Sequence, residues 1–216
     1  MSLDAKLDLY FNSLGNPKSG TSEDEGRIRE TTKSMRDRMA DWDRNGRLLI
    51  LGCGDGVEID YAKELGFKNI VAITRHDEEY NKEKYPEMFD FDMHDFPDDI
   101  EPFDYVYSKE TLEHSFAPYI LLCELNRVMK VGAKFCHLIA EGMEKQGEWY
   151  HVSCFPAWVW VDLFRMTDFA TEKLLLADGE TGYVGYKHQD KDLNKPLERY
   201  SLMTIYKNIP RENLTL

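Results

Sequence analysis

The fold of this chain is set where the sequence reads Leu48-Leu49-Ile50-Leu51-Gly52-Cys53-Gly54-Asp55-Gly56. The apolar run is typical of a buried strand, and a helical pattern from Val57 to Leu65 follows the last glycine. Glycine has no Cβ, so the backbone can turn sharply and a ligand can lie against it. The following helix offers unpaired N–H groups and a positive dipole end, which suit a nucleotide-like or carboxylate-bearing cofactor. The stretch therefore predicts a cofactor-binding turn between strand and helix, with a tight turn that holds no ligand as the alternative.

The composition is that of an ordinary soluble globular protein. A chain of 216 residues, 42% of them hydrophobic and 31% charged, is long enough for one large domain with a substantial core. No apolar run approaches the ~20 residues that a membrane helix needs, and the first residues do not resemble a secretory signal. The formal net charge of −13 repels phosphate backbones. We therefore expect neither nucleic acid nor a membrane as a partner.

The four cysteines, Cys53, Cys123, Cys136 and Cys154, lack the spacing of a disulfide framework or a zinc site. We interpret them as small buried apolar residues, which favours a reducing, cytoplasmic compartment. His151 and Cys154 are too isolated to indicate a metal site, so the sequence predicts no metal ligands.

Strand and helix patterns alternate after residue 46. Strands are expected at 47–51, 69–74, about 88–92, 103–107 and 134–140, and helices at 57–65, about 77–84 and about 118–129. Such alternation predicts an α/β fold with a doubly wound, mostly parallel sheet. A helix starting at 153–156 and running to about 166, and two late strands at 169–176 and 197–206 joined by a polar loop, complete the chain. The late strands predict an antiparallel C-terminal pair in a seven-stranded sheet.

Five segments in order resemble the class I, Rossmann-like S-adenosylmethionine-dependent methyltransferases. They are the glycine loop at 49–56, then Phe91–Pro97, Phe103–Ser108, Thr111–His114 and Glu124–Ala133. The likeness spans residues 47–140 well and the C-terminal part more loosely. It implies a methyltransferase that uses S-adenosylmethionine as its cofactor.

The resemblance also implies which residues bind this cofactor, at the carboxyl ends of successive strands: Gly52, Cys53, Gly54, Gly56, Thr74, Arg75, Asp92, Met93, His94 and Ser108. The methionine part would lie over residues 52–54 and face Ser108. Residues 92–94 would flank the adenine.

Two positions depart from the family's pattern. Ile50 stands two residues before the first glycine, where many relatives have an acid. Thr74 ends the second strand, where they have an Asp or Glu that accepts hydrogen bonds from the ribose hydroxyls. A threonine hydroxyl lacks the charge of a carboxylate, which weakens the contact by ~1–2 kcal/mol. Asp77 is an alternative ribose partner if the loop turns back.

Two other functions stay open. An NADP-dependent reductase would use Arg75 to hold a 2′-phosphate, but its loop should read Gly-x-Gly-x-x-Gly/Ala, and Val57 stands at the sixth position. The missing acids also fit a methyltransferase-like protein that binds a ligand or partner without catalysis.

We expect methyl transfer to a small-molecule acceptor by direct displacement, for which the protein must align the reactants and exclude water. His114 and His151 are the candidate catalytic bases if the acceptor is a hydroxyl or an amine. Alternatively, His114 packs at the start of a helix, and Glu113 is expected to be solvated or to cap a helix. The aromatic residues around His151 predict either the wall of a substrate pocket or a face packed on the sheet. Oxygen, nitrogen and carbon acceptors all stay open, as does the oligomeric state.

We expect a single domain over residues 1–216. Residues 1–45 would form an N-terminal helical extension, 46–140 the cofactor-binding core, and 141–216 the acceptor-side segment with the last strands. The extension and residues 141–160 flank the expected site, which predicts that they act as a lid.

Overall fold

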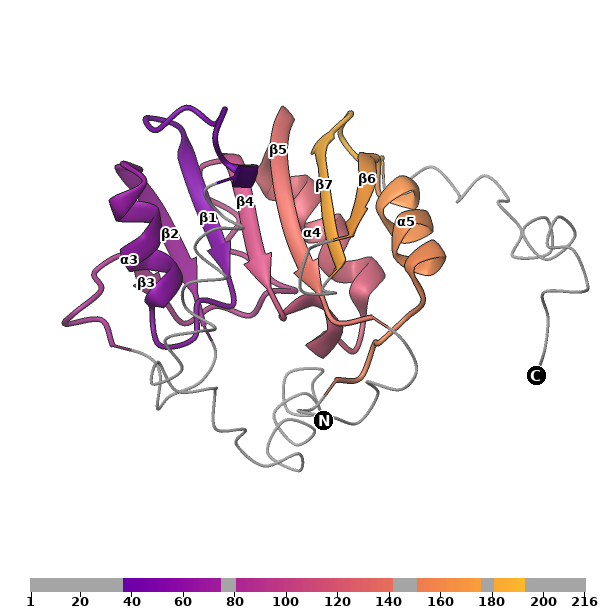
Figure 1. The fold of residues 1–216 in the computed structure, drawn as a ribbon, viewed down its shortest axis with the longest axis horizontal. Coiled ribbons are helices and arrows are strands. Elements are labelled where there is room, and N and C mark those ends of the chain that lie inside the picture. Colours follow the sequence, from indigo (N-terminus) through magenta and orange to yellow (C-terminus); the bar gives the residue numbers. More distant parts are fainter. Residues whose placement is uncertain (1–36, 75–80, 142–150, 176–180, 193–216) are drawn as a thin grey trace, which may run out of the picture.

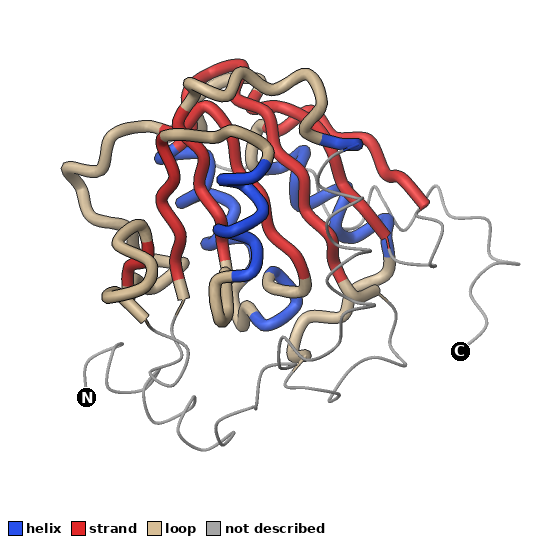
Figure 2. Tube along the Cα trace, turned by 60° about the vertical axis from the view of Figure 1, so that its left-hand side comes forward, coloured by secondary structure: helices blue, strands red, loops and turns tan. Residues whose placement is uncertain are grey.

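The computed structural model of the chain describes residues 37–74, 81–141, 151–175 and 181–192. These ranges form one seven-stranded sheet in the order β3-β2-β1-β4-β5-β7-β6. Helices cover both faces of the sheet (Figures 1 and 2). No helix in these ranges is both long enough and apolar enough to cross a membrane.

The sheet is parallel except at one side. Its parallel strands are β1 (Arg47–Leu51), β2 (Asn69–Ile73), β3 (Met88–Phe89), β4 (Phe103–Lys109) and β5 (Met129–Ile139). β7 (Thr181–Lys187) runs antiparallel to both of its neighbours, β5 and β6 (Phe169–Leu175). The predicted α/β fold, mostly parallel with an antiparallel C-terminal pair, is confirmed.

The helices lie in two layers. α3 (Val57–Glu64) covers one face of the sheet, and α4 (Pro118–Val128) and α5 (Ala157–Met166) cover the other (Figure 1). A short 3₁₀ helix, η1 (Leu112–His114), follows β4 at the edge where the parallel strands end. Such an edge is where ligands bind in open α/β sheets.

Strand β1 shows why the core has two halves. Leu48 and Ile50 join the apolar cluster on the α3 face, and Leu49 and Leu51 join the cluster under α4 and α5. Successive strand side chains point to opposite faces, so a strand covered on both sides must be apolar throughout. The unbroken apolar run that opens the sequence motif is therefore a consequence of the central position of β1.

The seventh strand is not the predicted one. β7 lies at Thr181–Lys187, inside the segment expected to be a polar loop, while the predicted strand at 197–206 lies outside the described residues. Gly182 and Gly185 interrupt an otherwise strand-favouring segment, so propensity alone does not mark it as a strand. Packing decides here, because Tyr183 is fully buried and a Cβ on Gly185 would lie 2.0 Å from the Ala170 carbonyl oxygen of β6.

Several predicted boundaries also move. Residues 81–84, the described end of the helix expected at 77–84, form a turn, and the strand expected at 88–92 is limited to β3. β5 begins at Met129 rather than near 134, with a register shift against β4 between Phe103 and Tyr105. The division into residues 1–45, 46–140 and 141–216 stays a prediction.

Candidate functional site

The glycine loop follows β1 at the carboxyl edge of the sheet. Gly52, Gly54 and Gly56 have φ angles of +74°, +48° and +98°, all in the left-handed region that favours glycine. A Cβ on Gly52 would lie 2.2 Å from Oγ1 of Thr111, which covers this glycine from the segment after β4. The first glycine therefore allows two neighbouring strand ends to approach each other.

The backbone donors of the loop divide into two groups. The N–H groups of Gly52 and Cys53 both donate to the Ile73 carbonyl of β2 at 2.9 Å, so they hold the loop against its neighbour. Within the described parts of the chain, the N–H groups of Gly54 and Asp55 have no acceptor. These two donors at the tip of the loop are available to an anionic or oxygen-bearing ligand.

Thr74 directly follows β2. It is buried, with 5% of its surface exposed, and its N–H donates to the Phe89 carbonyl of β3 at 3.2 Å. This strand end thus presents a hydroxyl where the methyltransferases that the sequence resembles have a carboxylate. Arg75 and Asp77, the other residues expected near the ribose, lie outside the described residues.

Asp92 and His94 form a hydrogen-bonded chain with Ser115. His94 Nδ1 lies 2.8 Å from Oδ1 of Asp92, and its Nε2 lies 2.7 Å from Oγ of Ser115. The same carboxylate oxygen accepts the His94 N–H at 2.9 Å. Both ring nitrogens of His94 are engaged, so the ring ties the loop after β3 to the end of η1. The adenine roles of Asp92, Met93 and His94 stay predictions, and any hydrogen bond from His94 to the base would have to replace one of these contacts.

Ser108 lies on β4 with its side chain fully buried. Its Oγ is 2.8 Å from Nδ1 of His137 on the adjacent strand β5. Burial lowers the pKa of His137 to about 3, so this imidazole is neutral in the folded protein. The hydroxyl of Ser108 is engaged within the sheet, which leaves its backbone as the part that can face a cofactor.

The segment at 151–153 is held against η1. The N–H groups of Val152 and Ser153 both donate to the Glu113 carbonyl, at 3.0 and 2.8 Å, and Ser153 Oγ donates to the Ser115 carbonyl at 2.6 Å. These bonds bring His151 beside His114, with 4.9 Å between the ring centroids. The two predicted bases, far apart in sequence, thus lie side by side at the carboxyl edge of the sheet.

Glu113 completes this group, and its predicted solvated or capping role is wrong. The residue is fully buried, and its Oε1 accepts the N–H of Ala140, just after β5, at 3.0 Å. The same oxygen lies 3.9 Å from Nε2 of His151. Nothing in a single sequence distinguishes a buried glutamate at the end of a strand from a solvated one, so the sequence carried no signal for this contact.

The aromatic residues after His151 divide between core and surface. Trp160 is fully buried in the core, 5.7 Å from the ring of Phe155, whereas Trp158 is 47% exposed. Trp149 and Tyr150 lie outside the described residues. Packing on the sheet, one of the two predicted roles, therefore accounts for Trp160 and Phe155.

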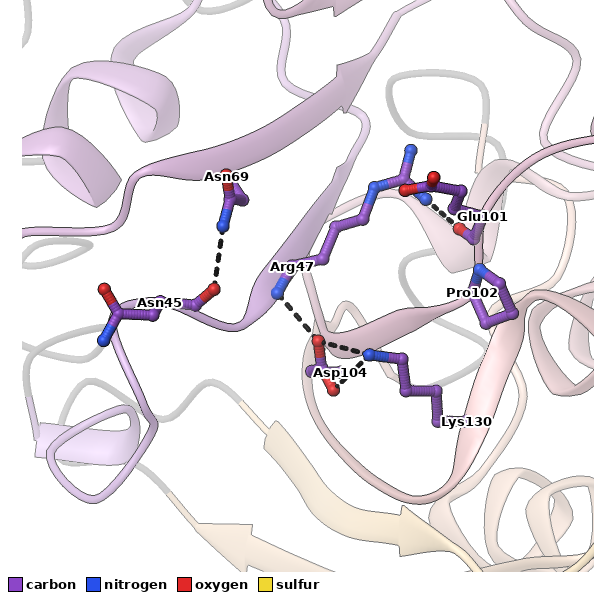
Figure 3. Close-up of a pocket in the computed structure, with 7 residues that line it drawn as sticks. All are labelled: Asn45, Arg47, Asn69, Glu101, Pro102, Asp104 and Lys130. Atoms are coloured by element: carbon purple, nitrogen blue, oxygen red, sulfur yellow. Dashed lines mark hydrogen bonds and ion pairs between the residues drawn. The ribbon is translucent and has the colours of Figure 1, made fainter.

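A hollow at the opposite end of the sheet is not a candidate functional site. It is lined where the strands begin, by Asn45, Arg47, Asn69, Glu101, Pro102, Asp104 and Lys130 (Figure 3). Asp104 accepts hydrogen bonds from the Arg47 N–H at 2.9 Å and from Lys130 Nζ at 2.8 Å. Burial would raise the pKa of Asp104, but the bonds from Lys130 and Arg47 outweigh it and hold that pKa below its usual value. These groups satisfy one another, as the dashed lines in Figure 3 show.

Comparison with known proteins gives a family match and a set of structural neighbours. Residues 49–137 match the family model of a methyltransferase domain. No curated protein matches the chain by sequence.

Three solved structures illustrate the likeness. The putative methyltransferase of Haloferax volcanii, solved with the Trm112 methyltransferase activator, is 19% identical with a TM-score of 0.61, over 76% of this chain and 95% of that one. The PH0226 protein of Pyrococcus horikoshii is 16% identical with a TM-score of 0.63, over 78% and 92%. A methyltransferase of Thermotoga maritima, described as a possible histamine N-methyltransferase, is 16% identical with a TM-score of 0.57, over 74% and 90%. At these identities the structural likeness establishes the fold.

Proposed function

We propose that this chain, whose residues 49–137 match the model of a methyltransferase domain, is a class I S-adenosylmethionine-dependent methyltransferase that transfers a methyl group to a small-molecule acceptor. Methyl transfer from S-adenosylmethionine is the activity of the family. Catalysis by this chain, the small acceptor and the residues that serve it are the proposed part.

The observation that carries the proposal is the geometry of the glycine loop. Three glycines in the left-handed region place the N–H groups of Gly54 and Asp55 at the carboxyl edge of the sheet, without acceptors among the described residues. Donors at this position fit the carboxylate of the cofactor's methionine part. Thr74 fits the ribose less well than an acid, but its hydroxyl can accept a hydrogen bond. The donor set as a whole fits S-adenosylmethionine.

S-adenosylmethionine supplies a methyl carbon already activated by the sulfonium charge. The chain's own residues therefore need only hold the donor, orient the acceptor and exclude water. Gly54 and Asp55 would bind the methionine carboxylate, and Thr74 would bind the ribose. His114 and His151 lie at the same edge, where either imidazole would take the proton of an acceptor hydroxyl or amine.

The charge of the chain supports a small acceptor. A formal net charge of −13 disfavours the approach of nucleic acid, whose binding depends on neutralising phosphates. A small uncharged or cationic molecule meets no such barrier.

Calorimetric titration with S-adenosylhomocysteine, the demethylated product, tests the cofactor step. We expect saturable binding of one molecule per chain, which Gly54→Ala should weaken by distorting a backbone at φ +48°. The matched control is Gly132→Ala, a glycine with φ +82° at the start of β5 that should leave binding unchanged. Binding of NADPH in place of S-adenosylhomocysteine would replace the proposal with the reductase.

The threonine in place of an acid at position 74 also supports a second candidate function. This is a methyltransferase-like protein that binds a ligand or partner but catalyses no methyl transfer. Such a protein would bind S-adenosylhomocysteine but transfer no label from methyl-labelled S-adenosylmethionine to any member of a panel of phenols, alcohols and amines. Transfer to one of them excludes this candidate.

A further inference from the structure

We propose that Glu113, His114 and His151 bind a divalent transition-metal ion of the zinc type. Each residue offers one ligand atom, and the three atoms all lie within 4.8 Å of one another. Two imidazoles and one carboxylate form a donor set that suits such ions and leaves coordination positions open. The sequence predicted no metal ligands, because His151 is distant from the other two residues along the chain.

The spacing is close to that of a filled site. Metal–ligand bonds of about 2.0–2.2 Å place neighbouring ligand atoms roughly 3–3.5 Å apart. Oε1 of Glu113 and Nε2 of His151 are 3.9 Å apart. Side-chain rotations that move these atoms by less than about 1 Å would bring them to metal-bound spacing.

The ligands are held by their surroundings rather than by chance contact. Glu113 is oriented by the N–H of Ala140, and its carbonyl accepts both N–H groups that follow His151. Hydrogen bonds of this kind are typical of ligating carboxylates. The three ligands thus come from two chain segments, η1 and residues 151–153, and the end of β5 supplies the N–H that orients Glu113.

The burial of the group also favours a cation. Glu113 is fully buried and His151 is 7% exposed, whereas His114 is only partly buried. Burial strengthens the attraction between this carboxylate and a divalent ion, and the more exposed His114 side leaves an approach for a further ligand.

The site has a consequence for the acceptor, which rests on the proposed function. An open position on a Lewis-acidic ion binds a hydroxyl and favours loss of its proton. Because His114 and His151 bind the ion, neither of them acts as the base when the metal is present. The acceptor oxygen then gives its proton to solvent and forms the bond to the methyl carbon with its own electron pair. The pair of the broken carbon–sulfur bond stays on sulfur, which yields a methyl ether and S-adenosylhomocysteine. We therefore assign a hydroxyl compound as the acceptor.

Metal binding is tested on the full-length chain after treatment with EDTA and its removal. Zn²⁺ is titrated by calorimetry, and Co²⁺ by the visible absorption of its coordinated form. We expect one ion per chain, and His114→Ala, His151→Ala or Glu113→Gln should each weaken binding by at least ~10-fold. The matched control is His188→Ala, an exposed histidine outside the cluster, which should bind as the unaltered chain does.

Titration of each variant with S-adenosylhomocysteine shows whether it remains folded and separates the two proposals. A chain that binds S-adenosylhomocysteine but no stoichiometric ion overturns the metal site alone. An ion whose affinity is unchanged in both His114→Ala and His151→Ala also overturns it. Stoichiometric metal without S-adenosylhomocysteine binding leaves the site standing and overturns the proposed function.

A separate labelling assay tests whether the acceptor is a hydroxyl compound. Methyl-labelled S-adenosylmethionine is offered with a panel of phenols, alcohols and primary amines, in EDTA and after addition of Zn²⁺ or Mn²⁺. Hydroxyl methylation that the ion restores is the expected result. Amine methylation that proceeds equally in EDTA would overturn the assignment of a hydroxyl acceptor.

Discussion

Gly52 shows how much of the site depends on one missing side chain. It combines a φ of +74° with a Thr111 side chain where its Cβ would be, so alanine meets both backbone strain and a clash. Gly132 has a similar φ of +82°, but no heavy atom lies within 4 Å of the Cβ position there. A comparison of Gly52 with Gly132 therefore separates the effect of the clash from that of the backbone strain.

We predict that Gly52→Ala lowers the free energy of unfolding by ~2–4 kcal/mol, and Gly132→Ala by only ~1 kcal/mol. Urea unfolding of both variants, followed by circular dichroism, measures the difference. Equal losses would mean that Thr111 moves aside without cost and that only the backbone conformation matters.

Thr74 is the residue at which the chain departs most from the methyltransferase pattern that it resembles. If its hydroxyl is a weak ribose partner, Thr74→Asp should tighten S-adenosylhomocysteine binding roughly 5- to 30-fold, the equivalent of ~1–2 kcal/mol. Calorimetry gives the affinity, and thermal unfolding checks that the buried carboxylate is tolerated. A folded Thr74→Asp chain with unchanged or weaker binding would show that the ribose is held elsewhere.

At the scale of elements, β7 depends on a buried lysine at its end. Lys187 is 2% exposed, and its Nζ donates to the carbonyls of Asn126 and Met129 at 2.7 Å each. These carbonyls lie where α4 ends and β5 begins, so the ammonium joins three elements. A charge-assisted bond to Asp190 balances the buried cation.

We predict that Lys187→Met, which keeps most of the side-chain volume, destabilises the fold by ~2–4 kcal/mol, because the two buried carbonyls of Asn126 and Met129 lose a charged donor. Lys173→Met on the adjacent strand β6 is the control, since Lys173 is partly exposed and its bond to Glu141 should contribute no more than ~1 kcal/mol. Thermal and urea unfolding report both. Similar small losses would show that β7 does not need its lysine.

The whole molecule should lose stability in acid partly through His137. This histidine is buried and neutral with a pKa of about 3, against 6.5 for the unfolded chain, so the unfolded state binds the extra proton first. The contribution of neutral His137 to the free energy of unfolding is complete above the pKa of the unfolded state. It is lost as the pH falls from 6.5 toward 3.

Between pH 6.5 and 5 this single group should cost ~2 kcal/mol of unfolding free energy. Urea unfolding at both pH values measures the loss, and His137→Asn should show a smaller one than the unaltered chain. His188→Asn, an exposed histidine, should keep the full dependence. An identical pH dependence in His137→Asn would show that other groups dominate acid unfolding.

Much of this architecture is readable along the chain because its causes are local. An apolar run is the pattern of a strand buried on both faces, and glycines before a helical pattern mark the turn that follows, so β1, the loop and α3 are predictable from residues 47–65. Alternation then predicts the parallel sheet, and the family likeness adds the cofactor. Strand β7 escapes this reasoning because two glycines interrupt its strand-favouring residues, and contacts with β5 and β6 stabilise it.

The acidic and basic side chains at the carboxyl edge could not be placed in this way. Glu113 and His151 meet because backbone bonds hold residues 152 and 153 against η1, and no local pattern encodes a contact across 38 positions. Ser108 and His137 face each other through strand register in the same way. Local periodicity specifies elements, whereas the chemistry of a site depends on long-range packing, which forms only when the chain closes on itself.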